Sequence, residues 1–271
     1  MNIYRAGWLA KLLALVTMGF LMLPLMAVIP VSFTGKRYLS MPEGDWSLRH
    51  YASLLSSPEW LGSLLHSSVV AVCAALLATL LATAFVIAIW YRSGAWTRWL
   101  IGLCMLPLIV PPVVSAMVLY FMTTRISRIA PGLGYDSLPG VILAHTLLIV
   151  PFGVINMLVA ISRIDRRIEL ASRNLGASLW QTTWMVILPN LRLAMLTTFL
   201  LCFVLSWEEI AVTLFITSWE VVTLPRQIWG GLRDNVDPVV AAISTLLIGI
   251  VLLLLLTRMA IESWREARRI G

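Results

Sequence analysis

Six long apolar stretches constrain this chain more than any other feature of its sequence. They lie near residues 8–33, 61–91, 97–123, 138–161, 190–217 and 238–261. A helix needs about 20 predominantly apolar residues to cross a bilayer, and each stretch reaches that length. Hydrophobic residues make up 60% of the chain and charged residues only 12%, whereas soluble domains have about 45–50% and 25%. The sequence therefore predicts an all-α membrane protein with six transmembrane helices, in a single domain over residues 1–271.

The basic residues are unequally distributed between the two sides of such a protein. If the N-terminus is cytoplasmic, thirteen of the twenty Lys and Arg residues lie on the inner side of the membrane. They include Arg5 before the first span, Arg163 between spans four and five, and Arg265 after the sixth span. An excess of basic residues in cytoplasmic loops sets the orientation of membrane proteins. We therefore expect both termini, and the loop at 163–189, to be cytoplasmic.

The chain shows no pattern typical of a catalytic or metal site. Cys73, Cys104 and Cys202 lie in apolar stretches without CxxC spacing, and the three histidines are scattered. Neither of the two lysines, Lys11 and Lys36, ends the phosphate-binding pattern GxxxxGK[ST]. We expect no enzymatic activity, no metal and no cofactor on this chain, and we expect that it is not an ATPase. The net charge of +7 comes from the membrane flanks, so we also expect no nucleic acid partner.

The polar loop at 163–189 has the pattern of two short helices joined by a glycine. Asp165 is placed to cap the first helix, and Gly176 suits its end. Ser178 and Gln181 form the pattern of a capping box that opens the second helix. Two interpretations of the loop remain open, namely a docking site for a partner protein and an amphipathic hairpin on the membrane surface.

Two adjacent carboxylates, Glu208 and Glu209, lie inside the fifth predicted span. An ionised carboxylate at mid-membrane costs about 2.5 to 3.5 kcal/mol on insertion scales, so these residues should not face lipid. Our hypothesis is that they line a pathway and attract an amine-bearing solute. The alternative is a structural pair, bound to helix ends or to arginines of a second subunit. Ser115 and Asn156 are further candidates for the pathway, although hydrogen bonds between helices would explain them equally well.

Small residues and prolines mark how two of the spans should pack. Pro107, Pro111 and Pro112 remove backbone donors from the third span, and such breaks are tolerated where the backbone is buried or lines a cavity. In the second span, alanines recur three or four residues apart, at Ala71, Ala75, Ala78 and Ala82. This spacing predicts a face of close helix packing.

The loop at 163–189 resembles that of permeases from ABC importers that work with a solute-binding protein. The family's loop reads E-A-A-x-x-x-G-x(9)-I-x-L-P, and this chain matches it from the second position onward, with Ser172 and Val186 as substitutions. It departs at the first position, where Leu170 replaces the glutamate and Glu169 lies one residue earlier. On a helix that shift turns the carboxylate by about 100°. The resemblance implies coupling helices that insert into an ATPase subunit, with coupling residues at Arg166, Glu169, Leu170, Ala171, Ser172, Gly176, Ala177, Ser178, Leu188 and Pro189.

Other segments resemble the permeases of polyamine importers in their order and spacing. They are Pro107–Ser115, His145–Pro151, Ser206–Phe215 and Leu224–Trp229. The resemblance implies the type I, methionine-importer-like fold and a second-permease subunit of the polyamine and opine group. It also implies a second permease in a heterodimer, two ATPase subunits that carry ATP and Mg²⁺, and a periplasmic solute-binding protein. The implied location, in contact with lipid, is the bacterial inner (cytoplasmic) membrane.

We therefore expect an ATP-driven importer of a small cationic solute, a polyamine such as spermidine or putrescine. Related importers carry amino acids, 4-aminobutyrate, opines or aminophosphonates, and these remain alternatives. From other classes, an ion-coupled secondary carrier or channel would use Glu208 and Glu209 as cation sites, and a membrane scaffold would leave them unexplained.

Overall fold

The computed structural model describes residues 7–92 and 94–270, with the side chains of 234, 235 and 264–270 left undescribed. Arg5 lies outside these residues, as does the side chain of Arg265. The described residues are almost entirely helical, and the one β-contact is an isolated antiparallel bridge between Thr34 and Trp46. The predicted all-helical class is confirmed, while the orientation of the termini stays a prediction.

Five helical segments are long and apolar enough to cross a membrane. They are α1 (Trp8–Val31), α3 (Pro58–Tyr91), α6 (Leu138–Ile161), the run that ends with α9 (Leu188–Trp207), and α12 (Val239–Ile270). A sixth span results if α4 (Ala95–Ile109) and α5 (Pro112–Ser127) count together. Those two helices meet at a bend of 103°. Pro111 and Pro112 explain why the helix is broken there, because proline lacks the N–H that would continue the helix and restricts the residue before it.

The fifth predicted span, 190–217, is also interrupted. Helix α9 ends at Trp207, and the short α10 (Ala211–Ile216) follows after a break of three residues. The remaining short elements are α2 (Arg49–Ser56), η1 (Pro131–Leu133), α7 (Arg166–Asn174), α8 (Leu179–Thr182), η2 (Thr183–Ile187), α11 (Leu224–Gly230) and η3 (Gly231–Asn235). Two of the six predicted spans are thus broken helices, and both breaks become important for the site.

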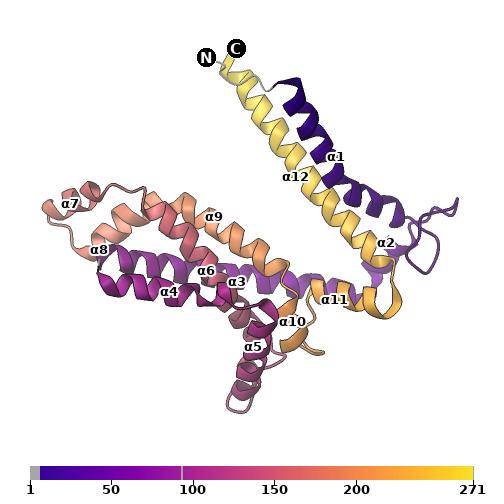
Figure 1. Ribbon diagram of the computed structural model, residues 1–271, viewed down its shortest axis with the longest axis horizontal. Coiled ribbons are helices and arrows are strands. Elements are labelled where there is room, and N and C mark those ends of the chain that lie inside the picture. Colours follow the sequence, from indigo (N-terminus) through magenta and orange to yellow (C-terminus); the bar gives the residue numbers. More distant parts are fainter. Residues whose placement is uncertain (1–6, 93, 271) are drawn as a thin grey trace. The chain divides into compact units, whose positions relative to one another are not determined.

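The chain forms two compact units, one from residues 1–61 and 228–271 and the other from 62–227. In the first unit, α1 lies along α12 (Figure 1), and the side chains of α1 are exposed over most of its length. The second unit is a bundle in which α6 packs against α9 and α4. A single domain over residues 1–271 stays a prediction.

Close packing of α3 against its neighbours holds the second unit together. The alanines at 71, 74, 75, 78 and 82 are all fully buried, which confirms the predicted packing face. Opposite them, a Cβ added to Gly153 of α6 would lie 3.2 Å from Ala82 and 3.3 Å from Thr198. Small side chains on both helices therefore let the backbones approach, as is common where helices associate in membranes.

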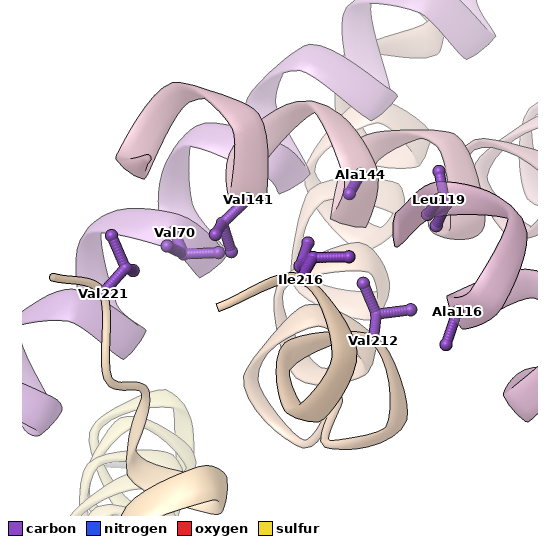
Figure 2. Packing of buried hydrophobic residues seen from close by; sticks show 8 residues of the cluster. All are labelled: Val70, Ala116, Leu119, Val141, Ala144, Val212, Ile216 and Val221. Carbon is purple, nitrogen blue, oxygen red and sulfur yellow. The ribbon is translucent and has the colours of Figure 1, made fainter. Parts of the chain in front are cut away.

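A buried apolar cluster fixes the two helix breaks next to each other. It joins α3, α5, α6, α10 and the segment after α10 through Val70, Ala116, Leu119, Val141, Ala144, Val212, Ile216 and Val221 (Figure 2). Because α5 follows the 103° bend and α10 follows the break after α9, this cluster brings two interrupted backbones into one region. The space that they leave is the first candidate site.

Candidate functional site

A cavity of about 490 Å³ lies where the two helix breaks meet. The segment around the α4–α5 bend contributes Pro107, Leu108, Val110, Pro112 and Ser115, and α6 contributes Leu148, Ile149 and Phe152. The third wall is the segment from α9 into α10, with Leu205, Glu208, Glu209, Ile210 and Ala211. Three of the four residues predicted for a pathway, Ser115, Glu208 and Glu209, therefore line one cavity, whose other walls are mainly apolar.

The two glutamates of this cavity have different surroundings. Glu209 is half-buried, and its Oε1 accepts the backbone N–H of Val212 at 2.9 Å. That contact satisfies one of the free donors at the start of α10. Glu208 ends α9 through its own N–H, which donates to the carbonyl of Val204 at 3.1 Å. Its side chain is exposed, and it has no ion-pair or hydrogen-bond partner within the described residues. The pair therefore divides into a carboxylate that stabilises a helix end and one that is free to bind.

Asn156 lies in a different place. Its side-chain amide donates to the hydroxyl oxygens of Thr198 at 2.8 Å and Thr197 at 3.3 Å. It lines a second cavity of about 600 Å³, together with Arg163, Asp165 and other residues of α6, α7 and α9. The structure does not bring Asn156 to the cavity of Glu208, so its role in a pathway stays a prediction.

The loop at 163–189 has the local structure predicted for it. The Asp165 carboxylate accepts the N–H of Arg167 at 2.9 Å and so caps α7. Gly176 has a φ of 88°, the left-handed conformation that a helix C-terminus often requires. Ser178 and Gln181 form the predicted capping box, with reciprocal bonds of 3.2 and 2.8 Å. The second helix then continues through the π-helical turn η2 into α9, with no separating turn.

Most of the predicted coupling residues are accessible on this loop. Arg166, Leu170, Ala171, Gly176, Ser178 and Pro189 are exposed, whereas Glu169, Ser172, Ala177 and Leu188 are half-buried. Large apolar side chains are exposed beside them, with Leu175 at 89% and Trp180 at 71%. No residue of α7 is buried. An exposed apolar surface of this kind is typical both of a protein-docking site and of a hairpin on the membrane surface.

The displaced glutamate of the loop has a contact within the chain. Glu169 accepts a hydrogen bond from the indole N–H of Trp90 at 2.8 Å, while Leu170 is 57% exposed. Trp90, one of twelve tryptophans in the chain, was not among the residues predicted from the sequence. Its position at the end of a span was the one available signal, because tryptophan is enriched at membrane interfaces.

Asp136, which precedes α6, is a second residue that was not predicted from the sequence. Its carboxylate accepts four backbone N–H groups, from Ser218, Trp219, Glu220 and Val221, at 2.7 to 3.3 Å. Partial burial acts to raise the pKa of Asp136, but the four donors together outweigh it and hold that pKa below its ordinary value of 3.8. This residue thereby fixes the segment that follows α10. No sequence pattern predicts these hydrogen bonds, because the four donors lie 82 to 85 residues from Asp136.

Comparisons with known proteins support an importer subunit. The profile of the family described as binding-protein-dependent transport system inner membrane component matches residues 80–265. The putrescine transport system permease protein PotI of Escherichia coli (strain K12) is 25% identical over 253 residues, which cover 92% of this chain and 88% of PotI. The spermidine/putrescine transport system permease protein PotC of Haemophilus influenzae is 28% identical over 236 residues, covering 86% and 88%. A probable molybdenum ABC transporter permease protein of Haloferax volcanii is 34% identical over 198 residues, covering 67% and 71%.

Solved structures show the same fold. A bacterial ABC transporter involved in the import of the acidic polysaccharide alginate matches with a TM-score of 0.65 at 15% identity, over 96% of this chain and 98% of that one. The alginate transporter in complex with its alginate pentasaccharide-bound periplasmic protein matches with a TM-score of 0.67 at 16% identity, over 96% and 97%. At such low identity the likeness concerns the fold alone.

Proposed function

The chain belongs to the family of binding-protein-dependent transport system inner membrane components, and we propose that the solute it carries is a polyamine such as putrescine or spermidine. As a member of that family it is a multi-pass permease subunit of an ABC importer, which works with a second permease, an ATPase and a periplasmic binding protein. It is not itself catalytic, and the ATPase is a separate chain.

The observation that carries the solute proposal is the free carboxylate of Glu208 in the cavity, beside Glu209 and Ser115. In a largely apolar cavity, a charge interacts more strongly than it does in water. An ammonium group of the solute would offset the cost of keeping this carboxylate ionised at membrane depth. The methylene chain of a polyamine would fit the apolar walls. The relatives PotI and PotC are named for putrescine and spermidine, which agrees with this choice.

The cavity also favours a polyamine over the zwitterionic alternatives. Amino acids, 4-aminobutyrate, opines and aminophosphonates carry an acidic group as well as an amine. That acidic group would need a cationic partner, and no Lys or Arg occurs among the described lining residues. A second carboxylate in the wall, Glu209, would repel it further. The molybdenum named for the Haloferax volcanii relative does not fit this amine-binding proposal either. Because the family is that of ABC importers, an ion-coupled carrier is no longer needed to explain the two carboxylates.

We further propose that the loop at 163–189 is the coupling loop that docks on an ATPase subunit at the cytoplasmic face. Burial against a partner would remove its exposed apolar side chains, such as Leu175 and Trp180, from water. Its helix caps give the loop a defined shape before it binds. In this arrangement both termini are cytoplasmic, the complex lies in the bacterial inner membrane, and the two permeases form a heterodimer. Two ATPase subunits bind ATP and Mg²⁺, and closure of their dimer displaces the loop and switches the side on which the pathway is open.

The solute proposal is tested with the purified complex of both permeases, the ATPase and the binding protein in proteoliposomes. We expect ATP-dependent uptake of radiolabelled putrescine by the wild-type complex. Glu208→Gln should reduce that uptake about tenfold at low solute, since an interaction of about 1.4 kcal/mol corresponds to a factor of ten. The matched control is Glu220→Gln, an exposed glutamate outside the cavity, which should transport at the wild-type rate.

Two results would contradict the solute proposal. The first is wild-type putrescine uptake by an assembled Glu208→Gln complex, which would show that the carboxylate does not bind the solute. The second is a wild-type complex that takes up a zwitterionic amino acid and no polyamine.

A further inference from the structure

Two residues of α7 hold Trp90, the penultimate residue of α3. The indole N–H of Trp90 donates to Glu169 Oε2 at 2.8 Å. Arg166 Nη2 donates to the backbone carbonyl of Trp90 at 3.2 Å, and the Arg166 guanidinium carbon lies 4.8 Å from the centre of the Trp90 ring. Arg166 and Glu169 are three residues apart, so they lie on the same face of α7. We call these three residues the Trp90 clasp.

Each contact of the clasp has a physical reason to persist. The carbonyl of Trp90 is among the last four of α3, and these have no partner within the helix. An arginine at that end satisfies the carbonyl and also interacts favourably with the negative end of the helix dipole. The bond from the indole to Glu169 is charge-assisted and is therefore stronger than a neutral hydrogen bond. The cation over the indole face adds a further attraction.

Trp90 is anchored in the core on its other side. Its side chain is only 9% exposed, and it belongs to a buried cluster with Ala82, Val86, Val154, Met157, Ile161, Ile187 and Leu191. These residues come from α3, α6, η2 and α9. In contrast, α7 has no buried residue, so apolar packing contributes little to holding it in place. Its position must depend mainly on polar attachments, of which the clasp is one.

Two further hydrogen bonds connect the same elements. Ser172 of α7 bonds to Thr182 of α8 at 2.7 Å between their hydroxyl oxygens. Tyr91, next to Trp90, bonds through its hydroxyl to Thr183 of η2 at 3.0 Å. Together with the clasp, these contacts tie α7, the end of α3 and the start of the run into α9 to one another. A displacement of α7 must therefore move the end of α3 or break the clasp.

We propose that Trp90 is the positioning residue that transmits displacement of α7 to α3, and that Glu169 acts on Trp90 within this chain. The proposal rests on the coupling role proposed for 163–189, and it assigns the displaced glutamate of that loop an internal function. The ATPase then contacts the remaining surface of α7, where Leu170 is exposed.

The test uses the complete complex, with ATP hydrolysis measured in the presence and absence of binding protein. Trp90→Phe keeps an aromatic ring in the core, and it removes the N–H donor together with part of the buried indole ring. The comparison of Glu169→Ala with Glu169→Gln therefore isolates the hydrogen bond itself. We expect it to lower binding-protein-stimulated hydrolysis about tenfold, as expected for a lost charge-assisted bond, with normal recovery of the complex. Glu169→Ala should show a similar loss. Glu169→Gln, which keeps an acceptor oxygen, should restore most of the stimulation. The double variant Trp90→Phe/Glu169→Ala should be no worse than Trp90→Phe alone, because Trp90→Phe has already lost the bond that Glu169→Ala removes.

The control is Trp96→Phe, since Trp96 lies in the first turn of α4 and is 81% exposed. It should match the wild type. Wild-type stimulation in Trp90→Phe, or losses in the two single variants that add in the double variant, would overturn the proposal. If Trp90→Phe fails to assemble, the comparison of Glu169→Ala with Glu169→Gln decides the outcome. The stimulation requires no knowledge of the solute, so a failed polyamine assignment would not affect this result.

Discussion

The loop at 163–189 and the segment from 207 to 221 are both irregular interruptions of helix, but the turns of the loop are shaped mainly by local contacts and the segment mainly by distant ones. The caps of the loop join residues two or three positions apart, as in Asp165 with Arg167 and Ser178 with Gln181. The segment after α9 depends on Asp136, more than 80 residues away. Further along the chain, the hydroxyl of Ser67 accepts the N–H of Leu224 across 157 positions.

This difference fits what each region is proposed to do. The local caps give the docking loop an internal shape that persists when the helices around it move, so it can act as a rigid surface for a partner. Its attachment to α3 depends instead on the distant contacts of the Trp90 clasp. A segment held by distant residues changes its shape when those residues move relative to it. Residues 208–211 of the second segment form one wall of the Glu208 cavity, and the cavity can therefore respond to rearrangement of the spans.

The largest effect is expected from Gly176→Glu in the loop at 163–189. A φ of 88° is strained for a residue with a side chain, at about 1–2 kcal/mol, and the substitution places a charge on the docking surface. A Cβ there would meet no atom within 4 Å, so strain and charge, without a clash, are the cause. We expect binding-protein-stimulated ATP hydrolysis to fall more than tenfold. Gly176→Asn, which tolerates the left-handed conformation, should retain most of it. Normal assembly and normal stimulation in Gly176→Glu would refute docking at this loop.

A smaller effect is expected from Asp136→Ala, which removes the distant partner of the segment from 207 to 221. Loss of the four accepted bonds should lower the Tm of the detergent-solubilised protein by about 3 °C at pH 7. Because the folded pKa of Asp136 lies below 3.8, the stabilisation is present above about pH 3.8 and is lost as the pH falls through the folded pKa. The Tm difference between wild type and variant should therefore shrink at pH 3. An equal Tm at pH 7 would show that the four bonds contribute nothing.

The smallest effect is expected from Ser178→Ala, which removes half of the capping box. Loss of such a cap costs about 1 kcal/mol. Hydrogen exchange measured by mass spectrometry should therefore become faster in peptides that cover 179–187 and stay unchanged in 207–221. Asp136→Ala should give the opposite pattern. If either variant altered exchange in both regions, the distinction between local and non-local control would not hold.

Apolar run lengths and helix-capping preferences were sufficient to predict much of the fold. Helix α6 spans Leu138–Ile161, as expected from an apolar run of the right length, and the caps at Asp165, Gly176 and Ser178 follow known preferences for those residues. The interruptions of the third and fifth spans were harder to predict from the sequence. The prolines at 107, 111 and 112 indicated a break, but a bend of 103° depends on what α5 packs against. For the fifth span, Glu208 and Glu209 marked an unusual position without showing that the helix ends there.

By itself, the sequence determined that this chain is a helical membrane protein with a capped polar loop and two carboxylates that cannot face lipid. These properties depend on hydrophobicity, on spacing of three or four residues and on the cost of burying charge, all of which act over short stretches of chain. Only the tertiary structure decided that Glu208 is free while Glu209 caps a helix, and that Glu169 bonds to Trp90. These contacts depend on which helices lie side by side. Contacts between distant residues produce no regular spacing in the sequence from which they could be predicted.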